Sequence, residues 1–329
     1  SREDIKHLSK ESFSFKNVGE TQATRNSSQD AINSIAKVLP TFFGGSADLS
    51  HSNMTFIKGD SLQDDAHRTE RNIQFGVREF AMATVLNGMM LHGGVRVFGG
   101  TFFVFSDYLK AALRLSALQN LPVTYVFTHD SIAVGEDGPT HEPIEHLASL
   151  RTIPNTYVFR PADATETQAA WYLAQNVNDK PTSIVLTRQN LPVLENSSFE
   201  KVAKGAYVVY ETSSDFDTIL IATGSEVALA ISVAQELERE GMKVRVVSMP
   251  SIELFEEQTS EYKEALLPRS IRRRVSLEMG NTALWYKYVG LDGLAIGIDK
   301  FGASAPANKV IEEYGFSVEK VVARIKNEL

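Results

Sequence analysis

The sequence has 329 residues, 43% of them hydrophobic and 22% charged, which is the composition of an ordinary globular protein rather than a disordered or fibrous one. Its 33 Lys and Arg against 41 Asp and Glu give a formal net charge of −8 with no long basic run, so nucleic acid is not an expected partner. No apolar run approaches the roughly 20 residues of a membrane span, and the absence of cysteine excludes disulfides and thiolate metal sites and fits a cytoplasmic location.

The first half of the chain alternates helical patterns with short β-rich runs. Its N-terminal stretch SREDIKHLSK is polar, has no signal-peptide core and lacks an initiator Met, so we expect a piece of a longer chain. The apolar periodicity predicts helices over 80–93, 108–120 and 164–177. The runs typical of buried parallel strands cover 123–130, 155–161 and 182–189.

The pattern changes near residue 190. Residues 190–205 lose all periodicity and gather Pro, Asn and Ser, after which strands and helices alternate again. The helix that begins at Glu226 has Ser225 as a candidate N-cap, and a closing helix follows Ser317. We therefore predict an α/β protein with two open, mostly parallel sheets. The predicted division is a first domain over 1–190, a linker over 191–203 and a second domain over 204–329.

Three polar loops follow predicted strands in the first domain. The loop GEDGPTH (135–141) comes after the strand 123–130, and TRQN follows the strand that ends near Leu186. The stretch FFGGSADLSHSN (42–53) shows the same transition from an apolar run to glycines. Ligand sites of open parallel sheets lie past the carboxyl ends of the strands, so we expect these loops at one edge of the sheet.

Common catalytic and nucleotide motifs are missing. The P-loop, a G-x-G-x-x-G after a strand, H-E-x-x-H and G-x-S-x-G do not occur. The run HEPIEH places His141, Glu142, Glu145 and His146 close together and could suggest a metal. However, Pro143 suits a helix start with acids in the first turn, so we favour that interpretation and expect no metal ligands in this chain.

Six runs in order resemble the pyrimidine-binding domain of transketolase: GGSADLSHSN, FGVREFAM, GGTFFVFSDY, THDSIAVGEDGPTHEP, RPADATE and TRQNLP. The region after residue 204, with ATGSEV and VRVVSMP, resembles that family's C-terminal domain. The G-D-G…N signature of the family's N-terminal diphosphate-binding domain does not occur. The resemblance therefore implies two domains of a three-domain, homodimeric enzyme. Its cofactors are thiamine diphosphate and Mg²⁺ or Ca²⁺, with the metal ligands in the N-terminal domain.

The resemblance assigns cofactor activation to Glu79. A carboxyl hydrogen-bonded to the pyrimidine nitrogen promotes the imino form, which removes the thiazolium C2 proton, and a buried carboxyl with a raised pKa could share that proton. From its position alone, Glu79 favours the first turn of the helix 80–93. Phe80 stands where many relatives have His, a departure that leaves the carboxylate unaffected.

Phe102, Phe105 and Tyr108 are spaced at i, i+3 and i+6, on one side of a helical turn. This spacing alone is typical of core residues. The resemblance implies that they form the aromatic pocket of the pyrimidine ring, a flat heterocycle suited to stacking. Both interpretations can hold, because such a pocket is lined by residues that also pack.

The resemblance also assigns substrate contacts. Asp137 resembles the residue that hydrogen-bonds the hydroxyl next to the donor carbonyl, and His141 resembles a histidine that shuttles protons to substrate oxygens. The positions that match the family's phosphate site are Arg25, Ser52, His129 and Arg188. Two guanidinium groups with a hydroxyl and an imidazole suit a phosphate dianion. Without the resemblance, the loop is typical of a solvated surface and each arginine of a surface cation.

These residues indicate a transketolase of the pentose phosphate pathway, which moves a two-carbon ketol unit from a ketose phosphate to an aldose phosphate. We expect the chain alone to be inactive, because it would hold only the pyrimidine ring of the cofactor. The strongest alternative is the β-subunit of a 2-oxo acid dehydrogenase E1 component, which has the same pair of domains. A 1-deoxyxylulose-5-phosphate synthase and a non-catalytic α/β binding module remain open.

Overall fold

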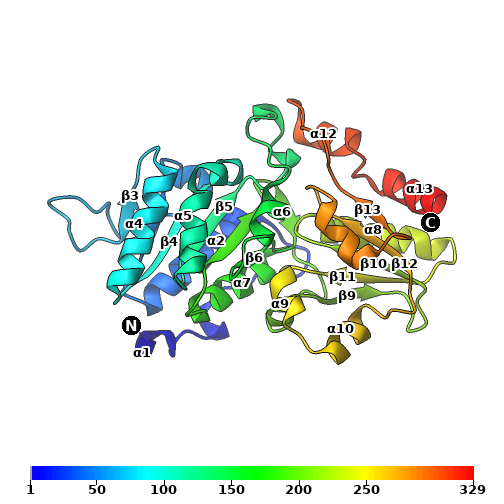
Figure 1. The fold of residues 1–329 in the computed structure, drawn as a ribbon, viewed down its shortest axis with the longest axis horizontal. Coiled ribbons are helices and arrows are strands. Elements are labelled where there is room, and N and C mark those ends of the chain that lie inside the picture. Colours follow the sequence, from blue (N-terminus) through cyan, green and yellow to red (C-terminus); the bar gives the residue numbers. More distant parts are fainter. Residues whose placement is uncertain (1) are drawn as a thin grey trace.

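The computed structural model describes residues 2–329, which form two lobes side by side (Figure 1). The first lobe (21–192) contains six parallel strands in the order β3-β2-β4-β5-β7-β6. Their bounds are β2 (Phe42–Ser46), β3 (Asn72–Gln74), β4 (Arg96–Phe102), β5 (Thr124–Thr128), β6 (Tyr157–Phe159) and β7 (Thr182–Leu186). Every residue of β5 and β7 is buried, as expected of strands covered on both faces.

Helices cover both faces of this sheet. One face carries α4 (Glu79–His92), α5 (Ser106–Leu118) and α6 (His146–Arg151), whose apolar side chains share one cluster with Val97 and Phe127. The other face carries α2 (Thr24–Val38) and α7 (Ala164–Asn176), packed against each other around Trp171. Short helical turns lie at the edges: α1 (Arg2–Ile5), η1 (Lys10–Ser12), α3 (Ser50–Asn53), η2 (Phe103–Phe105) and η3 (Ile132–Asp137).

A small ribbon joins the two ends of the first lobe. Strand β1 (Thr21–Ala23) pairs antiparallel with β8 (Asn190–Pro192). Just beyond it, the Asp163 carboxylate accepts hydrogen bonds from Leu194 N and Ser197 Oγ at 2.9 Å. Residues 190–205, which lack periodicity, are thus held by hydrogen bonds to the start of α7. This stretch includes the turn η4 (Lys201–Lys204) near its end.

The second lobe (207–328) has five strands in the order β13-β12-β10-β11-β9. All neighbours are parallel except β9, which runs antiparallel to β11, so the prediction of two open and mostly parallel sheets is confirmed. The strands are β9 (Tyr207–Glu211), β10 (Thr218–Ala222), β11 (Val244–Ser248), β12 (Arg273–Leu277) and β13 (Leu294–Ile296). The helical segments are α8 (Glu226–Arg239), α9 (Ile252–Glu256), α10 (Ser260–Leu266), η5 (Ala283–Trp285), α11 (Tyr286–Val289), α12 (Ala307–Glu313) and α13 (Val318–Glu328).

Buried apolar residues of α2 and α7 continue into those of β9, β10 and α8, so the lobes share one core. None of the described helices combines the length and the apolar character that a bilayer span needs.

Three local expectations were wrong. Gly44 and Gly45 lie inside β2 rather than in a loop. Position 45 requires glycine, because a Cβ there would come within 1.8 Å of the Ile73 carbonyl oxygen on β3. Ser225 does not cap α8 through its side chain; its hydroxyl donates to Glu226 instead. Pro143 does not begin a helix, since α6 starts three residues later at His146.

Candidate active site

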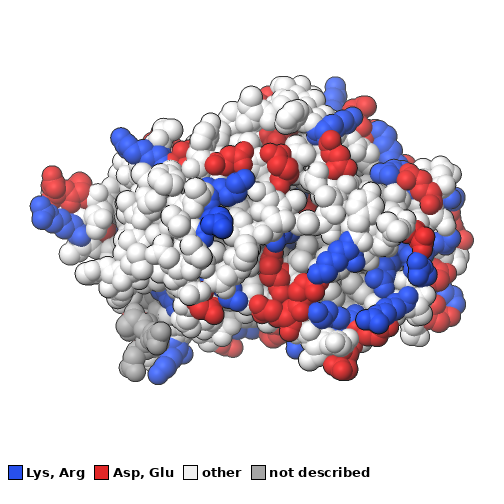
Figure 2. Space-filling model, viewed as in Figure 1, with Lys and Arg blue, Asp and Glu red and all other residues white. Residues whose placement is uncertain are grey.

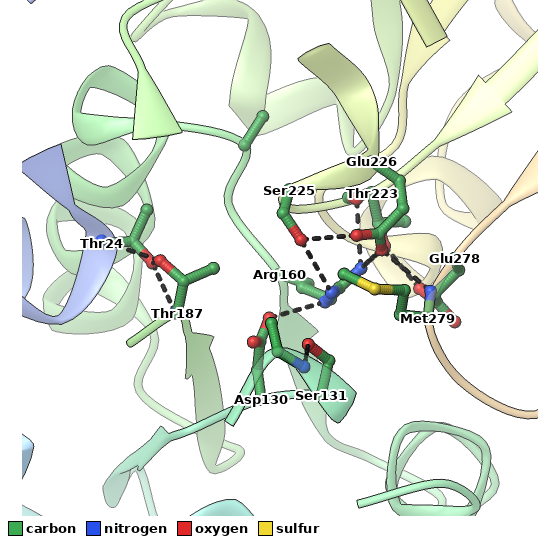
Figure 3. A network of polar contacts seen from close by, with 12 residues as sticks. Thr24, Asp130, Ser131, Arg160, Thr187, Thr223, Ser225, Glu226, Glu278 and Met279 are labelled. Atoms are coloured by element: carbon green, nitrogen blue, oxygen red, sulfur yellow. Dashed lines mark hydrogen bonds and ion pairs between the residues drawn. The ribbon is translucent and has the colours of Figure 1, made fainter. Parts of the chain in front are cut away.

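The candidate site lies past the carboxyl ends of the first lobe's strands. Strand β5 leads directly into His129, and β7 leads through Thr187 into Arg188. The hydroxyls of Thr24 and Thr187 lie 3.0 Å apart in the interior, and the Thr187 N–H donates to Thr24 Oγ1 at 2.8 Å (Figure 3). This contact brings the first turn of α2, and with it Arg25, beside the end of β7.

Arg25, Arg188 and His129 form a cluster without a counter-ion among the described residues. Arg25 Nη1 donates to the Ser52 carbonyl oxygen at 2.9 Å, while its Nε is buried without a hydrogen-bond partner. Burial and the positive charge of Arg188 both lower the pKa of Arg25. The positive charge therefore stays uncompensated, which suits an anion. Ser52, expected to offer its hydroxyl, instead reaches Arg25 through its backbone.

His129 is buried at 4% exposure and has a left-handed backbone with φ 63°. Its Nδ1 lies 2.8 Å from Thr128 Oγ1, which in turn donates to Asn53 Oδ1. Burial, followed by the charges of Arg25 and Arg188, lowers the pKa of His129 to about 3. The imidazole is therefore neutral near pH 7.

The three predicted aromatic residues form a stacked row. Phe102 and Phe105 have ring centroids 6.2 Å apart with planes at 9°, and Phe105 and Tyr108 are 6.0 Å apart at 29°. They do not share one helix face, because they come from the end of β4, the turn η2 and the start of α5. Tyr108 is 66% exposed, so the expectation of a core residue was wrong there.

Two histidines join this row to the cationic cluster. The Phe102 ring lies 3.8 Å from the His129 ring, and the His141 ring meets Phe105 edge-on at 5.5 Å. His141 Nδ1 is 2.9 Å from Thr140 Oγ1. The aromatic row and the cationic cluster are thus continuous.

A cavity of about 450 Å³ opens beside the row. Its lining residues are Ala47, Asp48, Leu49, Val77, Glu79, Phe105 and Tyr108. Glu79 is the first residue of α4 and is half-buried rather than buried. Its carboxylate has no hydrogen bond or ion pair with any described residue, whereas the neighbouring Phe80 is 50% exposed. Asp48, in the motif GGSADLS, lines the same cavity and was not singled out from the sequence.

The loop 135–141 begins within η3 and extends four residues beyond it. Gly135 and Gly138 have φ of 80° and 77°, which glycine adopts without strain. The loop brings His141 to the aromatic row but leaves the Asp137 side chain exposed. Asp137 is the predicted residue that the structure does not draw into the cluster.

The HEPIEH run divides into two environments. Glu145 and His146 lie with Asp107, their possible ligand atoms within 4.8 Å of one another, and His146 Nε2 is 3.0 Å from Asp107 Oδ2. Glu142 instead turns inward and is only 2% exposed. It is therefore not the first-turn acid that the sequence suggested.

Sequence reasoning missed the charge network between the lobes. Arg160 is fully buried past the end of β6, and its Nε donates to Asp130 Oδ2 at 3.0 Å (Figure 3). Its Nη1 pairs with Glu226 and donates to Thr223 Oγ1 at 3.0 Å, across the lobe boundary. Asp130 directly follows His129, so this network fastens one end of the site. Little in the sequence indicated it, since Arg160 fell near the end of the predicted strand 155–161, whereas β6 ends one residue before it at Phe159.

The comparisons with known proteins agree with this geometry. The family model of the transketolase pyrimidine-binding domain matches residues 20–193. This chain belongs to the transketolase family. The model of the transketolase-like C-terminal domain matches residues 205–317. These matches favour the transketolase family over the dehydrogenase β-subunit.

Individual relatives add detail. The probable transketolase of Streptococcus pneumoniae is 71% identical, covering 94% of this chain and 47% of its own length. A Pichia stipitis transketolase solved with sedoheptulose-7-phosphate superposes with a TM-score of 0.93 and 41% identity, over 97% of this chain and 47% of its own. A chain described as a split gene transketolase, an inactive β4 tetramer, has a TM-score of 0.75 and 26% identity, over 93% and 98%. The chain thus spans about half the length of the curated transketolases it matches.

Proposed function

We propose that this chain supplies the pyrimidine-binding part (1–190), a linker (191–203) and the C-terminal part (204–329) of a cytoplasmic transketolase of the pentose phosphate pathway. The complete enzyme transfers a two-carbon ketol unit from a ketose phosphate to an aldose phosphate. One observation carries the proposal: Phe102 lies against His129 and stacks on Phe105, which lines the same cavity as Glu79. A ring-binding cavity and an anion site are therefore continuous.

The cavity fits the aminopyrimidine of thiamine diphosphate. A flat heterocycle can stack on Phe105 or Tyr108, and the Glu79 carboxylate has no competing partner, so it is free to bind a ring nitrogen. Thiamine diphosphate supplies, when bound, the nucleophilic carbon and the electron sink that ketol transfer needs. Glu79 holds the proton at the ring nitrogen, and the aromatic row excludes water from the ring.

The remaining residues bind and orient sugar phosphates. Arg25 and Arg188, with His129 and Ser52, hold the phosphate, because two guanidinium groups without a counter-ion gain most from a dianion. Asp137 and His141 contact the hydroxyls near the reacting carbons, and His141 moves a proton at a substrate oxygen. The Pichia stipitis relative, solved with a seven-carbon sugar phosphate, supports this class of substrate.

The proposed assembly is a homodimer completed by a diphosphate-binding domain that holds Mg²⁺ or Ca²⁺. Helices α4 and α5 expose Val85 at 47%, Leu91 at 61% and Leu118 at 68%, and Figure 2 shows few charges over these helices. An exposed apolar face of this kind is typical of a subunit interface. The inactive split-gene relative, which spans the same region, supports a need for a further domain.

The test is reconstitution. Titration calorimetry of the chain with thiamine diphosphate and Mg²⁺ should show no micromolar binding, because ring stacking contributes about 0.5–1.5 kcal/mol beyond area burial against the roughly 8 kcal/mol that such a complex needs. Adding the diphosphate-binding domain of a close relative should produce ketol transfer. Steady turnover by the chain alone, or none after reconstitution, would contradict the proposal.

Glu79→Gln is the matched variant for the cofactor step. Gln keeps a hydrogen bond but cannot share a proton, so turnover of the reconstituted enzyme should fall by about 10²–10⁴-fold, the range of acid–base catalysis. The exchange rate of the bound cofactor's C2 proton should fall with it. An unchanged exchange rate would remove Glu79 from this role.

A further inference from the structure

The loop 135–141 is supported by the second lobe. Ser304 Oγ donates to the Glu136 carbonyl oxygen at 2.5 Å. A Cβ added at Gly138 would lie 3.0 Å from Ser304 Cβ, and one at Gly135 would lie 3.0 Å from Ala307 N. The backbones therefore approach so closely that each glycine is needed at its position. In Figure 1 this green loop lies beside α12.

Glu142 lies at the base of the same contact. Its carboxylate faces Gly302, where an added Cβ would come within 1.7 Å of Oε2. The N–H groups of Gly135 and Ala303 approach the carboxyl from opposite lobes without reaching full hydrogen-bond geometry. Two residues further on, Asn281 N donates to the Ile144 carbonyl oxygen at 3.0 Å and adds a second contact between the lobes.

Burial with no charged partner among the described residues raises the pKa of Glu142 to about 7. Burying a carboxyl group costs free energy unless its oxygens accept hydrogen bonds. The proposed chemistry makes no use of Glu142, which does not line the cavity and whose carboxyl lies against Gly302 of the second lobe. Its position instead joins the loop that carries Asp137 and His141 to residues 302–304.

We propose that Glu142 is a positioning residue and that residues 302–304 of the second lobe fix the loop 135–141 through it, so that the second lobe sets the placement of Asp137 and His141 on the substrate. This inference rests on the proposed function for the identity of the substrate. It gives the second lobe a part in selecting the sugar hydroxyls, while the phosphate stays with Arg25 and Arg188 on other loops.

The first test uses the chain alone and requires no activity. Amide hydrogen exchange over 135–141, followed by mass spectrometry, should speed up roughly tenfold in both Ala variants. Ser304→Ala removes the hydrogen bond to the Glu136 carbonyl oxygen, and Glu142→Ala removes the carboxyl packed against Gly302. Glu142→Gln keeps the shape and the acceptor oxygen and should stay near the parent rate. The exposed Ser232→Ala on α8 is the matched control and should change nothing. Strand β7 should keep its protection in every variant.

The second test uses the enzyme assembled with a diphosphate-binding domain. Ser304→Ala and Glu142→Ala should lower kcat/KM roughly tenfold to the same extent for phosphorylated and unphosphorylated donors, and Glu142→Gln should restore it. If Ser304 and Glu142 only stabilised the fold, the Ala variants would lower the melting temperature, and Glu142→Gln would not restore kcat/KM. Unchanged exchange over 135–141 in both Ala variants overturns the inference, as does faster exchange with unaltered kcat/KM. If the parent enzyme shows no ketol transfer, the proposed function fails, and the exchange rates alone decide the contact.

Discussion

Arginine has opposite surroundings in two regions of this molecule. Arg160, between the lobes, is fully buried, and each of its three guanidinium nitrogens donates to an acceptor. Although burial alone would lower the pKa of Arg160, Glu226 and Asp130 raise it. Arg25, at the edge of the first sheet, has a backbone carbonyl as acceptor and another arginine nearby, and its pKa is lowered.

This difference separates a structural cation, Arg160, from the cation proposed to bind phosphate, Arg25. A buried guanidinium whose nitrogens already donate to protein acceptors is not available to a ligand, and removing it leaves its carboxylate partners buried without a counter-ion. A guanidinium that is repelled by a neighbouring positive charge is stabilised when an anion binds beside it. Three changes would test the distinction.

The largest effect is expected for Arg160→Met. The change leaves Asp130 and Glu226 buried without their cation, which costs about 3–5 kcal/mol of unfolding free energy. Urea unfolding of the chain measures it. The matched control is Arg239→Met, whose ion pair with Glu236 is 74% exposed on the arginine side and should contribute less than about 1 kcal/mol. Equal losses in the two variants would end the distinction.

A smaller effect is expected for Arg188→Ala and Arg25→Ala, and on a different quantity. Losing one charge-assisted bond to phosphate costs on the order of 1.5–3 kcal/mol, or about tenfold or more in affinity. The KM of the reconstituted enzyme for sugar phosphates should rise accordingly, and the KM for unphosphorylated analogues should change little. The free energy of unfolding should stay within about 0.5 kcal/mol. An equal rise for both substrate types would show that these arginines do not bind phosphate.

The last effect concerns pH and His129, and it is the smallest per pH unit. Its folded pKa of about 3 lies below the ordinary value, so the unfolded chain binds a proton first as pH falls. The neutral His129 side chain therefore contributes to the free energy of unfolding, and this contribution is fully present above about pH 6.5. It is lost as pH falls toward 3, by up to about 1.4 kcal/mol per pH unit. His129→Asn suits the left-handed backbone and should remove that slope between pH 6 and 4.5, measured as the difference from the parent protein. Parallel stability curves for the two proteins would show that His129 is not the group responsible.

Glu278 titrates in a separate range. Although burial would raise its pKa, Arg151 lowers it to about 2 through two hydrogen bonds of 2.7 and 2.8 Å. The ionised Glu278 carboxylate contributes fully to the free energy of unfolding above its unfolded pKa, and this contribution is lost only as pH falls below about 4.5. The range chosen for His129 therefore excludes it.

The sequence allowed much of the fold to be predicted, because β5, β7 and β10 are short runs of buried residues and α8 has a clear helical period. The motif loops also lie at the carboxyl edge, where Arg25, His129 and Arg188, the residues proposed to bind phosphate, are grouped together. Other features were out of reach. Arg160 and Glu226 are 66 residues apart, and no local pattern joins them. Glu142 followed the rule for a helix start, but packing against Gly302 prevailed over that local preference.

The ribbon of β1 and β8 has a consequence for how this protein can be rearranged. Gly19 N donates to the Val193 carbonyl oxygen at 3.0 Å, and Val193 N donates to that of Glu20 at 2.9 Å, so the chain enters and leaves the six-stranded sheet at one point. Sequences whose ends meet in this way tolerate circular permutation and transfer between genes. The close approach of these residues therefore meets the geometric condition for circular permutation, with new termini in an exposed loop and a short bridge across the ribbon.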